Sequence, residues 1–200
     1  MSDSGRQRHG VIVLAAGSST RLGQAKQLLT IDGETLVHRA VRIGLETNPV
    51  DCVVVCGADA EMIKASVADL DCRVVSCADY RSGLSASMHT GLAALRSDCA
   101  AALILLTDQA ALDADHLRQL CESWRCDPQR AAASGYADTV GVPAMLPRSW
   151  FPELARTHGD RGARDLLRAR SDEVDVSAAP ELAHDIDTPG DLVESGILKG

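Results

Sequence analysis

The sequence predicts an α/β protein built as three layers, with helices on both faces of a doubly wound, mostly parallel β-sheet. Short, nearly continuous apolar runs alternate along the chain with amphipathic stretches. This β-α-β-α order is typical of parallel sheets with right-handed crossovers. The 200 residues, 46% of them hydrophobic, suit one domain with a substantial core.

The apolar runs are the expected strands. A strand that is covered on both faces is apolar throughout, not only at alternate positions, so these runs indicate strands with helices on both faces. They comprise residues 11–14, 52–55, 73–75 and 102–106.

The amphipathic stretches are the expected helices, because their apolar residues recur three and four positions apart. They cover residues 36–45, 62–67 after Asp59 as N-cap, 84–95, and 117–124 after Asp113.

After about residue 127 the expected strands and helices no longer alternate regularly. Residues 131–133, 139–142 and 173–176 are further expected strands, and Pro189 suits the first turn of a short closing helix. We expect residues 1–8 to form a disordered tail and residues 9–200 to form one domain, whose last part completes a substrate pocket.

Charge and composition exclude several function classes. The formal net charge of -8 argues against a nucleic-acid polymer or an anionic membrane as partner, because both require a basic face. The polar start and the lack of any apolar run of about 18 residues predict a cytoplasmic protein. The seven cysteines contain no C-x-x-C pair, which suits neither a disulfide scaffold nor a zinc site.

A glycine-containing loop with two cations follows the first expected strand, in the segment Leu14-Ala-Ala-Gly-Ser-Ser-Thr-Arg-Leu-Gly-Gln-Ala-Lys26. Small residues let backbone N–H groups approach an anion closely, and Arg21 and Lys26 are suited to phosphate oxygens. The spacing matches neither G-x-G-x-x-G nor G-x-x-x-x-G-K-[ST]. An ordinary turn with solvated cations is the alternative, but ligands bind at the carboxyl ends of such strands, which favours a phosphate site.

Two aspartates are candidate metal ligands. Asp108 ends the most hydrophobic strand, a costly place for a carboxylate unless it is paired or metal-bound. Asp187 lies far away in the sequence, and two carboxylates near bound phosphate groups would suit Mg²⁺. Asp108 could instead occupy a turn or cap a helix, Asp187 could cap the following helix, and Asp185 could replace Asp187 as ligand.

Several motifs together resemble the molybdopterin guanylyl/cytidylyltransferase superfamily. The Leu-Ala-Ala-Gly-x-Ser-x-Arg-x-Gly pattern from Leu14 to Gly23 is similar to that of its nucleotidyltransferases. The later segments 141–144, 159–164 and 185–189 resemble its molybdenum cofactor cytidylyltransferase branch, called MocA-like. Segments 82–88 and 105–109 are similar to its nucleoside and metal segments, although Ala110 stands where members usually carry proline.

The resemblance implies a Rossmann-like nucleotide-diphospho transferase fold and a set of site residues. Arg21, Lys26 and Asp108 would be catalytic, and Asp108 and Asp187 would hold Mg²⁺. Arg161 and Arg164 would contact the acceptor, with a solvated helix start as the alternative for these two arginines. The nucleotide would bind at Leu14, Ala15, Ala16, Gly17, Arg21, Lys26, Gly83, Ser85 and Ser87.

The implied reaction moves an NMP onto the phosphate of the pterin molybdopterin and releases pyrophosphate. CMP from CTP is the favoured group. The resemblance also implies a transient contact with a molybdoenzyme. Two alternatives stay open, namely a sugar- or alditol-phosphate nucleotidyltransferase and a non-catalytic nucleotide-binding accessory protein for a molybdoenzyme.

Overall fold

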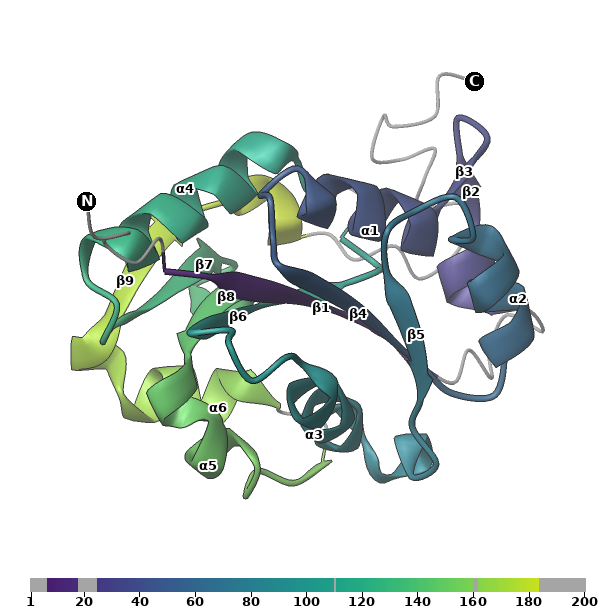
Figure 1. Cartoon of the computed structure of the whole chain (residues 1–200). Coiled ribbons are helices and arrows are strands. Elements are labelled where there is room, and N and C mark those ends of the chain that lie inside the picture. The colour runs from purple at the N-terminus through teal and green to yellow at the C-terminus, as the bar shows by residue number, and fades with distance from the viewer. Residues whose placement is uncertain (1–6, 18–24, 110, 160–161, 184–200) are drawn as a thin grey trace, which may run out of the picture.

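The computed structural model describes residues 7–17, 25–109, 111–159 and 162–183 (Figure 1). Seven strands form one sheet in the order β5-β4-β1-β6-β8-β7-β9. Every neighbouring pair is parallel except those of β8, which runs antiparallel to β6 and to β7. The mostly parallel sheet is therefore confirmed. The strands are β1 (His9–Ala15), β4 (Asp51–Cys56), β5 (Arg73–Ser76), β6 (Ala101–Leu106), β7 (Ala131–Tyr136), β8 (Thr139–Pro147) and β9 (Val174–Ala178).

Helices cover both faces of this sheet (Figure 1), as the apolar character of the strands predicts. One face carries α1 (Leu36–Leu45), α2 (Ala60–Ser66) and α4 (Ala114–Cys126). The other carries α3 (Leu84–Ala94), α5 (Phe151–Leu154) and α6 (Ala163–Ala169). Alternate residues of β1, β4 and β6 enter the two core layers, so these central strands are buried on both sides.

Two helix starts show side-chain caps. Asp113 accepts a hydrogen bond from the backbone N–H of His116 at 2.8 Å and opens α4, as expected. Thr35 does the same for α1 by accepting from the N–H of His38 at 3.2 Å. Asp59 precedes α2, but its side chain makes no capping hydrogen bond.

Two features differ from the sequence prediction. A short hairpin, β2 (Thr30–Ile31) with β3 (Glu34–Thr35), stands between β1 and α1, where no strand was expected. Strand β8 continues past Val142 to Pro147, and its pairing with β7 is irregular where Ala133 gives way to Ser134. Pro143 lies opposite this irregularity, where its missing N–H breaks no regular ladder hydrogen bond.

The remaining expectations concern chain ends, cysteines and membranes. Residues 1–6 and Pro189 lie outside the described residues, so the disordered tail and the closing helix stay predictions. All seven cysteines are unpaired, and Cys72 and Cys126 are the ones that are not buried. Within the described ranges, no helix has the length and apolar character needed to cross a bilayer.

The buried His9 makes the stability of the fold depend on pH. Its Nε2 donates to Thr47 Oγ1 at 2.8 Å, since that hydroxyl itself donates to the carbonyl of Gly44. Burial, with a smaller contribution from Arg125, lowers the pKa of His9 to about 4. In the unfolded chain the same side chain takes up its proton near pH ~6.5. Between these values the unfolded state binds more protons, so the free energy of unfolding falls as the pH falls.

We therefore expect the protein to lose about 3 kcal/mol of stability through His9 between pH ~7 and pH ~4. Urea unfolding of the wild type and of His9→Gln across this range measures the effect. The variant should lose less stability on acidification, and parallel curves for the two proteins would contradict the assignment.

Candidate active site

The candidate site lies where the strand order reverses. Successive strands after β1 proceed outward through β4 and β5, and the chain then returns to place β6 on the other side of β1. In open α/β sheets such a switch point opens a crevice outside the carboxyl ends of the strands. Here a cavity of about 460 Å³ lies between the residues that follow β1 and those that follow β6.

Most of the expected nucleotide and metal residues that the structure describes line this cavity. They are Leu14, Ala16, Gly17, Lys26, Gly83, Ser87 and Asp108. Ala15 is buried behind the wall as the last residue of β1, and Ser85 is buried in the first turn of α3. Neither side chain forms part of the lining.

Lys26 and Asp108 form an ion pair inside the cavity. Lys26 opens a short 3-10 helix, η1 (Lys26–Leu28), and Asp108 follows β6. Lys26 Nζ lies 3.1 Å from Asp108 Oδ2, and the two side chains are only 16% and 26% exposed. The structure thus brings together a cation and a carboxylate that are 82 residues apart in the sequence.

Asp108 also has a carboxylate oxygen that could bind a metal ion. Its Oδ1 is buried and has no hydrogen-bond partner among the described residues. A buried carboxylate oxygen without a partner is costly, and a divalent cation is a natural partner for it. No group of three or more His, Cys, Asp or Glu side chains suited to a metal ion occurs in the described part of the chain.

Part of the cavity lining comes from Tyr80 and Arg81 of η2 (Tyr80–Ser82) and from Gly83, which follows it. Gly83 precedes α3 with φ 105°, a conformation that side-chain-bearing residues rarely adopt. The ring of Tyr80 packs on Gly57, where a Cβ would lie 2.9 Å from the ring, and the Arg81 guanidinium lies 5.3 Å from the ring centroid. Arg81 thereby adds a further cation to the lining.

Gln109, next to Asp108 in the sequence, forms a hydrogen-bonded group with Tyr136 and Val142. Gln109 Nε2 donates to the carbonyl of Val142 at 2.9 Å and lies 3.3 Å from the hydroxyl of Tyr136, which donates to the same carbonyl at 2.7 Å. These bonds tie the turn that carries Asp108 to β7 and β8. Arg164 is exposed on α6, and a Cβ at Gly141 would lie 3.7 Å from its Nε.

Arg164 therefore borders β8 near this polar group, but it does not line the cavity. Gly162, next to the start of α6, approaches Leu84 of the cavity wall: a Cβ there would lie 3.2 Å from that side chain. Arg21, Arg161, Asp185 and Asp187 lie outside the described residues. Their expected roles stay predictions.

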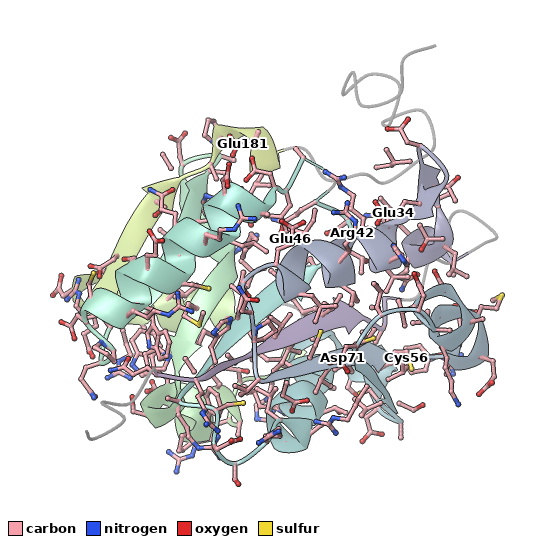
Figure 2. All side chains as sticks on the ribbon, turned by 45° about the horizontal axis from the view of Figure 1, so that its top comes forward. Glu34, Arg42, Glu46, Cys56, Asp71 and Glu181 are labelled. Atoms are coloured by element: carbon pink, nitrogen blue, oxygen red, sulfur yellow. The ribbon has the colours of Figure 1, made fainter. Side chains whose placement is uncertain are left out.

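A charged cluster ties the β2–β3 hairpin to α1. Glu34 of β3 pairs with Arg42 and with His38 of α1, and His38 Nε2 lies 3.2 Å from Asp69. Arg42 also reaches Glu46 along the outer side of α1 (Figure 2). The hydrogen bond from Arg42, aided by His38, outweighs burial and lowers the pKa of Glu34 to about 2. Burial alone would lower the pKa of His38, but its two carboxylate partners raise it.

Sequence reasoning missed Gln27, Tyr80 and Arg81, and it gave Thr107 and Gln109 no role of their own within segment 105–109. The first of these contacts the glycine loop directly, because Gln27 Nε2 donates to the carbonyls of Ala15 and Gly17. The signal that could have found the two glutamines is their place in the sequence, directly after the two charged residues of the site.

The comparisons with known proteins agree with this geometry. Residues 11–174 match the MobA-like NTP transferase domain. The chain is 31% identical over 188 residues to nicotine blue oxidoreductase of Paenarthrobacter nicotinovorans, a match that covers 88% of this chain and 91% of the relative. It is 28% identical over 191 residues to the purine catabolism protein PucB of Bacillus subtilis (strain 168), covering 89% and 91% of the two chains.

Solved structures give the same result. Rv0371c from Mycobacterium tuberculosis H37Rv superimposes with a TM-score of 0.82 at 28% identity, over 94% of this chain and 97% of that one. A nucleotidyl transferase from Methanothermobacter thermautotroptrophicus shares the fold, with a TM-score of 0.80 at 22% identity, over 94% and 95% of the two chains. The matched residues include all those that line the cavity, and also β8 and α6. The chain therefore belongs to the MobA-like NTP transferase family and is a nucleotidyltransferase of that superfamily.

Proposed function

We propose that this protein transfers CMP from CTP to the phosphate of molybdopterin, the reaction of a molybdenum cofactor cytidylyltransferase. The observation that carries the proposal is the ion pair of Lys26 with Asp108 in the cavity at the carboxyl ends of β1 and β6. The motifs of the MocA-like branch, and a cavity of about 460 Å³ beside a glycine loop, support it.

The reaction is a displacement at phosphorus. An oxygen of the acceptor phosphate forms a bond to the α-phosphorus of CTP, while the bond from that phosphorus to the oxygen bridging to the β-phosphate breaks. Pyrophosphate leaves with the bonding electrons. Positioning and charge neutralisation dominate such transfers, so no protein nucleophile is needed. A phosphomonoester, with a second pKa near ~6, is already anionic at neutral pH, and no general base is needed either.

Each charged residue has one task in this scheme. Lys26, together with Arg21, would hold the β- and γ-phosphates, where negative charge accumulates as pyrophosphate leaves. Asp108 and Asp187 would hold Mg²⁺, which supplies charge neutralisation at the phosphate oxygens when bound. The unpartnered Oδ1 of Asp108 fits this role. A relative of known structure, Rv0371c, is described in complex with manganese, at 26% identity and a TM-score of 0.77.

The acceptor would lie on the side of β8 and α6. Arg164, beside Gly141, and Arg161 would bind the phosphorylated pterin, and the helix start offers N–H groups to an anion. A cytoplasmic location, a single domain over residues 9–200 and a transient contact with a molybdoenzyme belong to the same proposal.

Other acceptors and other chemistries are the competing candidates. A sugar- or alditol-phosphate nucleotidyltransferase keeps the same cavity and changes the acceptor, whereas an accessory protein binds the nucleotide without turnover. A redox reaction is a further candidate because one relative, at 31% identity, is named an oxidoreductase.

Pyrophosphate release tests the proposal. The protein is incubated with CTP, GTP, UTP or ATP, with Mg²⁺ and with molybdopterin or a sugar phosphate. We expect release with CTP and molybdopterin, and a CTP-dependent rise in melting temperature through mass action. Release only with a sugar phosphate would favour the first alternative, and a melting shift without release would favour the accessory protein. Consumption of reduced nicotinamide or flavin without pyrophosphate release would favour the oxidoreductase.

A further inference from the structure

Gln27 is a buried polar residue in the wall of the nucleotide cavity. Only 3% of it is exposed, and it follows Lys26 in the short helix η1. Its Nε2 lies 2.9 Å from the carbonyl oxygen of Ala15 and 2.8 Å from that of Gly17. Both partners can only accept, so the amide nitrogen must face them, and both of its hydrogens are used.

These two bonds tie the glycine loop to the turn that carries Lys26. One amide group spans the carbonyls on either side of Ala16, at the point where the chain leaves β1. Because a trans peptide group is planar, fixing the carbonyl of Ala15 also fixes the direction of the N–H of Ala16. Gln27 thus sets the orientation of the backbone at residues 15–17, where the glycine loop begins, and through its neighbour the position of Lys26.

The amide oxygen of Gln27 shows that the need to fill space does not explain why glutamine stands at this position. Oε1 of Gln27 is buried and has no hydrogen-bond partner among the described residues. An apolar side chain of similar length would fill the same space without burying an unsatisfied oxygen. The two N–H donors are therefore the feature that distinguishes glutamine at this position.

We propose that Gln27 is a positioning residue for the nucleotide: it holds residues 15–17, the start of the glycine loop, and Lys26 in the relative arrangement that the triphosphate requires. This inference rests on the proposed function, because it takes a nucleoside triphosphate as the ligand of the cavity. Gln27 acts through the loop and through Lys26.

The test compares Gln27→Met, which keeps the length and removes the donors, with Gln27→Glu, which places carboxylate oxygens opposite two carbonyls. The Kd for CTP with Mg²⁺ is measured by calorimetry, well below the melting temperature of each variant. We expect the Kd to rise about tenfold for Gln27→Met, the effect of losing two neutral hydrogen bonds, and further for Gln27→Glu. A residue that only filled the core would lower the melting temperature and leave this Kd unchanged.

Gln129 provides the matched control, since it is exposed in the segment between α4 and β7 and does not line the cavity. Gln129→Met and Gln129→Glu should bind CTP like the wild type. In the absence of nucleotide, amide hydrogen exchange in peptides covering residues 14–17 should be faster in both Gln27 variants than in the Gln129 variants. This readout remains available for a variant that binds too weakly for calorimetry.

The outcomes separate the two proposals. If the wild type binds CTP and both Gln27 variants bind it equally well, or if exchange at residues 14–17 is unchanged, the inference about Gln27 is overturned and the proposed function stands. If the wild type binds none of CTP, GTP, UTP and ATP, the proposed function fails, and with it the nucleotide that Gln27 is inferred to position.

Discussion

Replacing Lys26 by alanine is expected to lower kcat about 10²–10³-fold, the usual effect of removing one donor that faces developing charge. In the structure Lys26 Nζ lies 3.1 Å from Asp108 Oδ2, inside the cavity and only 16% exposed. Such a shielded ammonium interacts more strongly with phosphate than a solvated one does. Because charge accumulates on the leaving pyrophosphate, the loss should fall on kcat more than on the KM for CTP.

Two further variants make this result specific. Lys26→Arg keeps the charge but changes its shape, so it should retain part of the activity. Lys64→Ala removes an exposed lysine from α2 and should behave like the wild type. Steady-state pyrophosphate release gives both constants, and a Lys26→Ala enzyme with a raised KM and an intact kcat would refute the assigned role.

Replacing Asp108 by asparagine is expected to lower kcat about 10³-fold. A divalent cation at a phosphoryl centre contributes several kcal/mol, and each ~1.4 kcal/mol corresponds to a factor of ten in rate. Asparagine has the shape of aspartate but lacks the charge that Mg²⁺ prefers. The Oδ1 of Asp108 is buried without a hydrogen-bond partner among the described residues, and the proposed function assigns this oxygen to the ion.

A second expected effect of Asp108→Asn is that CTP binding no longer depends on the metal ion. In the wild type, EDTA should abolish turnover and reduce the rise in melting temperature that CTP causes. In Asp108→Asn the CTP shift should be small and insensitive to EDTA. Asp113→Asn, an exposed substitution at the N-cap of α4, is the matched control, because asparagine caps helices as well as aspartate does. An Asp108→Asn enzyme with wild-type Mg²⁺ dependence would exclude this ligand role.

The central sheet could be predicted because its strands are apolar throughout. Residues 11–14, 52–55 and 102–106 lie within β1, β4 and β6, and the predicted helices lie within or close to the observed ones. The β2–β3 hairpin was missed although Asp32-Gly33 is a typical hairpin dipeptide, and both residues have positive φ, 51° and 83°. Its two-residue strands are too short to show an alternating pattern.

The charged residues of the site could be predicted, but the residues that hold them could not. Lys26 and Asp108 stand out beside a glycine loop and an apolar strand. Gln27 and Gln109 look like ordinary surface residues in the sequence, because their acceptors belong to β1, its following loop, β7 and β8. Burial of a polar side chain against backbone carbonyls depends on tertiary structure, which the local sequence does not report.

The antiparallel direction of β8 has a consequence for the evolution of acceptor choice. Its first residues, near Gly141, lie at the same sheet edge as the carboxyl ends of β1 and β6, since Ala144 already pairs with Ile104. The tight turn at Ala137 and Asp138, which joins β7 to β8, therefore projects beyond that edge. In the proposed function the acceptor lies on this side of the sheet. Lengthening the turn would then change the surface beside β8 and leave the residues that line the cavity unchanged, so the turn is a natural point at which one scaffold could acquire new partners.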